Sequence, residues 1–306
     1  MLLIAIVLAP LVMFLAISAE GRLGPAAGGW IAGLPIAFAV TLFAVARTTG
    51  AMTASRVAAS AAGHVPAQVA FGLIFGAVLV RWGLTAAGIA GVLGYVTASV
   101  TLAQIPPYAA IALGVADLAA GAALIPRQPS RTRRPRKPST AIVICLSAAV
   151  AVLGATLASQ AAGPVLGGAV AAFPTTSATL AISIAAQGKR NDAANVAFGL
   201  ISSLPCFLVL ALVVAGAAPH IGLCSFPIAA TSALAAAALT WRHMNSRVKR
   251  SVRTSHLPGA RPRCHGHWQG SADSEICLTL ERQRNPAHRQ QRAAAAASPS
   301  DDRSQL

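Results

Sequence analysis

Residues 163–174 read GPVLGGAVAAFP, and residues 24–35 read GPAAGGWIAGLP. Both segments fit the pattern G-P-x-x-G-G-x-x-A-x-x-P at an offset of 139. A second repeated segment follows each block. The sequence VAFGLI at residues 69–74 occurs again at residues 196–201, at an offset of 127. Two ordered blocks with matching prolines indicate that the chain is a duplicated unit.

The composition around both blocks is that of a membrane protein. Hydrophobic residues make up 55% of the 306 positions and charged residues only 10%, with a mean hydropathy of +0.64, whereas soluble domains carry about a quarter of their residues as charged ones. Before residue 242 the only acids are Glu20, Asp117 and Asp192. Charge-free runs of about twenty residues, the length that spans a hydrocarbon core, separate the basic clusters. The sequence therefore predicts an all-α, polytopic transmembrane helix bundle.

Nine segments are predicted as spans: 1–19, 24–47, 66–82, 84–104, 107–125, 140–159, 164–187, 193–217 and 220–241. The first could instead be a signal peptide, since Ala16-Ile17-Ser18 offers a small-x-small cleavage site. It lacks a positive n-region, which favours an uncleaved span. The predicted domains are transmembrane repeat 1 (1–125), a basic linker (126–139), transmembrane repeat 2 (140–241) and a basic tail (242–306).

The relative orientation of the two repeats depends on residues 84–125. As one helix this stretch would be about 63 Å long, twice the thickness of the bilayer core. Pro106 and Pro107 lie in its middle, where a helix is interrupted, so two spans are predicted. Five spans then separate equivalent points of the repeats, which places them in inverted topology, as in many secondary transporters. A single crossing would make the repeats parallel.

The net charge of +16 is explained by topology rather than by nucleic-acid binding. Basic residues next to spans are retained on the cytoplasmic side. The linker segment 127–137 carries six bases, so the linker and the tail are predicted to be cytoplasmic, in a multi-pass cell-membrane (inner-membrane) protein. The expected partner is the lipid bilayer, and no nucleic acid.

The repeated block has a physical interpretation. Pro25 and Pro164 suit the first turn of a helix, and glycines four residues apart let helix backbones approach closely in lipid. The predicted packing glycines, whose faces could also support a homo-oligomer, are Gly24, Gly28, Gly29, Gly33, Gly163, Gly167 and Gly168. Pro35 and Pro174 fall near mid-membrane, where they either kink the helix or interrupt it and open a substrate or ion site.

The second copy is the more polar one after its proline. Thr175, Thr176 and Ser177 follow Pro174, and their hydroxyls could bind a small cation or polar solute, or bond back to their own helix. Asp117 is the only acid well inside a predicted span. Such a carboxyl could carry a proton or bind a cation. It could equally be a protonated group bonded to a neighbouring helix, or lie nearer the interface.

No enzymatic chemistry is indicated. The spans hold no Ser-His-Asp order, no H-E-x-x-H and no P-loop, and the scattered cysteines suggest neither a disulfide framework nor a metal site. No cofactor is expected. The predicted function is a secondary transporter or permease for a small solute or ion, with alternating access between the repeats. The alternative is a scaffold or assembly subunit that packs partner helices on its glycine-rich faces.

An inverted five-plus-five unit would have ten spans, one more than the nine predicted. Residues 242–306 hold twelve of the 24 Lys and Arg and no apolar periodicity. They are predicted to be either a disordered tail or the product of a shifted reading frame that replaced the tenth span.

Overall fold

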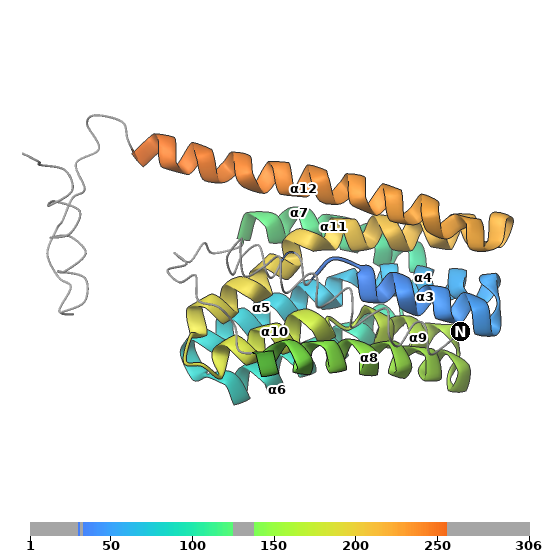
Figure 1. Ribbon diagram of the computed structural model, residues 1–306, viewed down its shortest axis with the longest axis horizontal. Coiled ribbons are helices and arrows are strands. Elements are labelled where there is room, and N and C mark those ends of the chain that lie inside the picture. Colours follow the sequence, from blue (N-terminus) through green and yellow to red (C-terminus); the bar gives the residue numbers. More distant parts are fainter. Residues whose placement is uncertain (1–29, 31–32, 125–137, 256–306) are drawn as a thin grey trace, which may run out of the picture. The chain divides into compact units, whose positions relative to one another are not determined.

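The computed structural model describes residue 30 and residues 33–124 and 138–255. Within these ranges every regular element is a helix, with no strand. The helices are α3 (Ile36–Thr49), α4 (Ala51–Gly63), α5 (Val65–Trp82), α6 (Leu84–Leu102), α7 (Pro107–Leu124), α8 (Pro138–Ala161), α9 (Gly163–Ala172), α10 (Thr175–Ala185), α11 (Arg190–Ile221) and α12 (Ser225–Ser255), with a 3-10 turn at Gly222–Cys224 (Figure 1). The all-α fold is as predicted.

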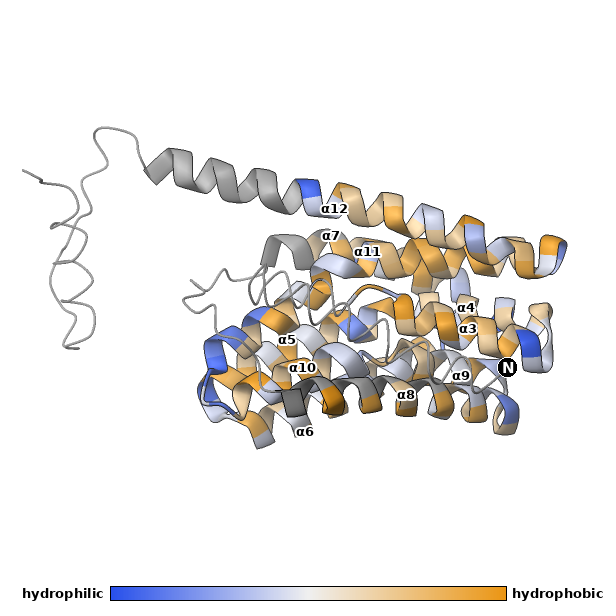
Figure 2. Ribbon diagram, viewed as in Figure 1, coloured by the Kyte–Doolittle hydropathy of each residue, from blue (hydrophilic) through white to orange (hydrophobic). Residues whose placement is uncertain are grey.

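Four helical stretches are long and apolar enough to cross a membrane: Val65–Trp82, Leu84–Leu102, Gly163–Ala185 and Arg190–Arg242. Ile36–Thr49 and Pro107–Leu118 are apolar but shorter. Four such stretches do not establish the nine predicted spans, and the first predicted span lies outside the described residues. Figure 2 shows the strongly hydrophilic residues mainly near the helix ends, with apolar residues along their middles. This distribution suits helices in a membrane.

Residues 84–124 form two helices rather than one. α6 ends at Leu102 and α7 begins at Pro107, because a proline at the first turn of a helix needs no N–H partner there. The predicted division at the proline pair is therefore present in the structure.

α4 is a helix that the hydropathy pattern did not predict. Ala54, Val57, Ala58 and Ala61 on this helix are fully buried. Alanine favours a helix, but Arg56 and several serines kept this stretch below the hydropathy of a span. Because α4 lies against protein on much of its surface, small side chains and not high hydropathy are what its position requires.

α4 and α5 run antiparallel to α11. The hydroxyl of Ser55 donates a hydrogen bond of 2.7 Å to the carbonyl oxygen of Ala215. On α5, a Cβ added at Gly72 would meet Ala197 and Ile201, one at Gly76 would meet Phe198, and one at Gly83, directly after α5, would meet Arg190. From Ser55 to Gly83 the partner on α11 thus moves back from residue 215 to residue 190. The two VAFGLI segments therefore lie on α5 and α11 and pack against each other.

The chain divides into two units, residues 1–248 and 249–306. α12 spans their boundary and continues to Ser255, beyond Trp241, where the predicted last span ends. Arginine, lysine and serine are compatible with a helix, so an apolar helix can extend into a basic one without interruption. The rest of the predicted tail, residues 256–306, lies outside the described residues.

Candidate functional site

The helix that carries the second repeated block is broken at Pro174. α9 ends at Ala172, and Phe173 has an extended backbone (φ −62°, ψ 128°). Proline cannot donate the N–H that a continuous helix needs, and its ring clashes with the preceding turn. The amide of Thr175 instead donates to the carbonyl oxygen of Phe173 at 2.8 Å. α10 therefore starts anew at Thr175 after a tight turn centred on the proline.

Pro35 makes the same turn. Its backbone angles (φ −77°, ψ 38°) are close to those of Pro174 (φ −79°, ψ 56°). The amide of Ile36 donates to the carbonyl oxygen of Leu34 at 2.8 Å. In both copies the proline carbonyl then accepts the N–H four residues later at 2.9 Å. α3 and α10 consequently begin with one geometry, at the two prolines that the repeated pattern aligns.

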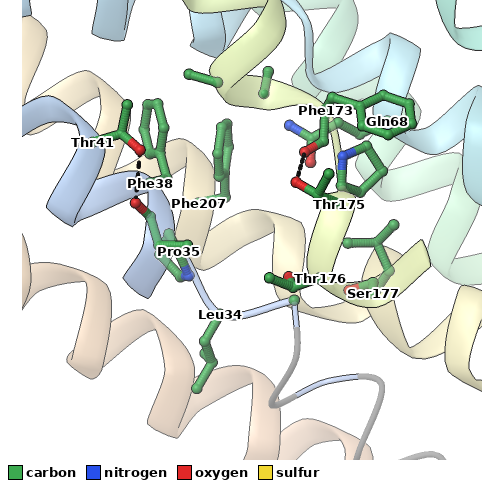
Figure 3. Close-up of a pocket in the computed structure, with 16 residues that line it drawn as sticks. Leu34, Pro35, Phe38, Thr41, Gln68, Phe173, Thr175, Thr176, Ser177 and Phe207 are labelled. Carbon is green, nitrogen blue, oxygen red and sulfur yellow. Dashed lines mark hydrogen bonds between the residues drawn. The ribbon is translucent and has the colours of Figure 1, made fainter. Parts of the chain in front are cut away.

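The two proline turns line one cavity (Figure 3) of about 50 Å³. A water molecule needs roughly 10–15 Å³ on this measure, so the cavity has room for a few waters or one small solute. Its lining residues are Gly33, Leu34, Pro35, Ala37, Phe38, Thr41, Gln68, Ala171, Ala172, Phe173, Pro174, Thr175, Thr176, Ser177, Leu200 and Phe207.

The lining is polar in part but carries no charged side chain. The hydroxyls of Thr41 and Thr175 donate to backbone carbonyls of their own segments, at 2.9 and 3.2 Å. Gln68 and Ser177 differ from them. They are only 2% and 1% exposed, and neither Gln68 Nε2 nor Ser177 Oγ has a hydrogen-bond partner within the described part of the chain. A buried polar atom without a partner costs about 1–3 kcal/mol, so these two atoms point to a bound molecule.

Aromatic rings form opposite walls of the cavity. Phe38 of α3 and Phe207 of α11 have ring centroids 4.4 Å apart. On the other side, Phe173 packs edge-on against Phe71 at 5.5 Å and against Tyr95 at 5.0 Å. These contacts hold Phe173 in its extended conformation between the two halves of the broken helix.

The glycines of the repeated block fall into three groups. A Cβ at Gly33, Gly167 or Gly168 would collide with Ser203, Ser159 or Ser60, respectively, so these three lie at close helix contacts. Gly163 has nothing within 4 Å of its added Cβ; its positive φ of 83° is what favours glycine there. Gly24, Gly28 and Gly29 lie outside the described residues.

Five of the six predicted solute-site residues line the cavity, and Asp117 does not. Asp117 lies half-buried on α7, with no hydrogen bond or ion pair to another described residue. The sequence interpretation missed Thr41 and Gln68. An amide in the first turn of an apolar helix was a signal for Gln68, since polar side chains are rare in spans and usually face a partner or cavity.

Among the described residues, no group of three or more His, Cys, Asp or Glu side chains could hold a metal ion. Comparisons of the chain with protein-family models, curated proteins and solved structures found no match. The geometry of the cavity is therefore what a functional proposal has to rest on.

Proposed function

We propose that this protein is a membrane permease that moves a small solute or ion through the cavity between the two proline breaks. The observation that carries the proposal is the meeting of two matching proline turns, at the starts of α3 and α10, at one uncharged polar cavity. Discontinuous helices in corresponding positions of two repeats are the usual way in which secondary transporters expose backbone groups at the bilayer midplane.

The proposal includes two repeats in inverted topology. Element boundaries support it, because several recur at the offset of 139 that aligns the prolines. The starts of α3 and α4 correspond to those of α10 and α11, and the end of α5 corresponds to that of α11. Pro66 likewise corresponds to Pro205. The antiparallel contact of α4 and α5 with α11 is the direction that inversion requires.

The offset of 127 fits this correspondence less well. The offset of 127 aligns the two VAFGLI segments with each other. The offset of 139 instead makes residues 69–74 equivalent to residues 208–213 of α11. Because the VAFGLI segments contact each other across α5 and α11, we attribute their likeness to a shared contact and not to equivalent positions.

Alternating access would follow from this arrangement. Pro174 separates α9 from α10, and Pro35 precedes α3, so small rotations about either proline can open the cavity towards one side and close it towards the other. In a pair of inverted repeats, each repeat can adopt the conformation of the other. The same two proline hinges would therefore produce both the outward-open and the inward-open state.

Accessibility of Ser177 tests the proposal. In a chain whose other cysteines are replaced, Ser177→Cys should react with a membrane-impermeant thiol reagent in both right-side-out and inside-out vesicles. A rigid scaffold would leave this position reachable from neither side, and a one-sided pore lining would leave it reachable from only one.

Two native cysteines supply the controls. Cys206 is fully buried and does not line the cavity, and Cys224 is exposed in the turn before α12. A chain that keeps only Cys206 should stay unlabelled, and one that keeps only Cys224 should react in one vesicle orientation. If Ser177→Cys behaved like either control, the permease proposal would be wrong.

A further inference from the structure

The carbonyls at the two proline turns already accept backbone N–H groups. At the Pro174 turn, the carbonyls of Phe173 and Pro174 accept backbone N–H groups. At the Pro35 turn, the carbonyls of Leu34 and Pro35 do the same. A cation prefers oxygen ligands that are free to coordinate it, and each of these carbonyls has already given one of its two lone pairs to an N–H.

Both side-chain atoms that lack partners can donate a hydrogen bond. Gln68 Nε2 is an amide nitrogen, which can only donate, and the hydroxyl of Ser177 can donate once it has an acceptor. Figure 3 shows Gln68 and Ser177 reaching the cavity from different helices, α5 and α10. Both side chains are at least 98% buried, so bulk water does not satisfy them.

The backbone adds to this excess of donors. α3 and α10 both begin at the cavity, and the N-terminal end of a helix carries a partial positive charge. Two such helix ends at one site favour a negatively charged ligand. No Asp or Glu lines the cavity to oppose it.

We propose that the cavity binds a small monovalent anion, either inorganic or a short carboxylate, held by Gln68 Nε2, Ser177 Oγ and the first turns of α3 and α10. This inference names the substrate class of the proposed permease and rests on that function. The cavity volume limits the ligand to a few non-hydrogen atoms. The absence of a buried cation from the lining keeps binding weak enough for release, as transport requires.

The test is the thermal stability of the purified full-length protein in detergent. Chloride, nitrate, formate and acetate are titrated as sodium salts, with sodium gluconate keeping the ionic strength constant because gluconate is too large for the cavity. We expect the unfolding midpoint to rise saturably with at least one of the four, since a ligand that binds the folded state stabilises it. A response to chloride and nitrate alone would identify an inorganic ligand, and a response to formate or acetate a carboxylate.

Substitutions at Gln68 give the sharpest readout. Gln68→Glu replaces the donor by a carboxylate, so the anion response should disappear. Gln68→Leu and Ser177→Ala should weaken the apparent affinity by about tenfold to a hundredfold, the value of one hydrogen bond to a charged ligand. The matched controls are Gln187→Glu and Ser183→Ala, which lie on or next to α10 outside the cavity and should leave the response unchanged.

Three results would overturn the anion assignment. They are a response to lithium, sodium or potassium gluconate that Gln68→Glu strengthens, an anion response that Gln68→Glu retains, and no response to any salt. None of these depends on whether Ser177→Cys is reached from both sides. The ligand assignment and the permease proposal can therefore fail separately.

Discussion

The hydroxyl of Tyr95 on α6 donates a 2.6 Å hydrogen bond to the carbonyl oxygen of Ala169 on α9. In an unbroken helix this carbonyl would accept the N–H of Phe173, which here donates to Val170 instead, at 3.2 Å. Tyr95 thus satisfies a backbone group that the break at Pro174 leaves free, while its ring packs on Phe173. A neighbouring helix stabilises the discontinuity.

Tyr95→Phe removes this hydrogen bond and keeps the ring. We expect the free energy of unfolding to fall by about 0.5–2 kcal/mol, because a carbonyl in an apolar interior loses its donor. Denaturation of the purified protein in mixed micelles would measure it. Tyr108→Phe is the control, since Tyr108 is 76% exposed; equal losses in the two variants would contradict a capping role for Tyr95.

Gly168→Ala tests the contact between α4 and α9. Its added Cβ would lie 2.5 Å from the Ser60 side chain and 2.7 Å from the backbone oxygen of Val57. The backbone of a packed helix cannot yield locally, so we expect a loss of about 1–3 kcal/mol in the free energy of unfolding. Gly88→Ala, in the interior of α6 with nothing within 4 Å, should be neutral or stabilising. An unchanged Gly168→Ala protein would show that α4 and α9 can separate without cost.

Pro174→Ala restores the N–H that the break lacks. Proline disfavours a helix interior by about 3 kcal/mol, a factor of roughly a hundred in an equilibrium, so removing it shifts α9 and α10 towards one continuous helix. The cavity should then close, and labelling of Ser177→Cys should slow. Pro205→Ala is the control, because α11 continues through Pro205 without a break. Labelling that slows equally in both variants would show that proline loss in general, not the break, is responsible.

Asp117 lies away from the cavity. Its substitution therefore separates binding of the anion from coupling of anion transport to protons. Asp117→Asn should leave the anion response of the detergent-solubilised protein unchanged. If Asp117 carries a proton with the anion, the same variant should lose uptake driven by a proton gradient across proteoliposomes while keeping exchange of the same anion. Loss of both would place Asp117 in the ligand site, against the geometry described above.

The sequence predicted those parts of the fold that local chemistry determines. The proline pair divided α6 from α7, and the repeated G-P-x-x-G-G-x-x-A-x-x-P pattern located both proline turns and the hydroxyls after Pro174. It left open whether Pro174 kinks or interrupts its helix, because that outcome depends on Phe71 and Tyr95, which are distant in sequence. Gln68 was missed for the same reason: its significance comes from the cavity that α3 and α10 build around it.

α4 escaped prediction for a different reason. Hydropathy identifies helices that face lipid, and α4 is lined with alanine and serine because it faces protein. Ser55 and Ser60 even donate hydrogen bonds to carbonyls of α11 and α9. In a hydropathy profile, an interior helix of small residues has the low values of a loop.

The proposed inverted arrangement of the repeats makes a prediction about sidedness. Thr53 lies near the end of α4 that contacts Ala215 through Ser55, whereas Gly188 precedes Arg190, which lies beside Gly83 at the far end of the α5–α11 contact. Cysteines introduced at Thr53 and Gly188 should therefore be labelled from opposite sides of the membrane by an impermeant reagent. Cys224, in the turn after α11, should share the side of Thr53. Labelling of Thr53→Cys and Gly188→Cys from one side would require parallel repeats, and the two proline turns could not then act as inverted hinges around one site.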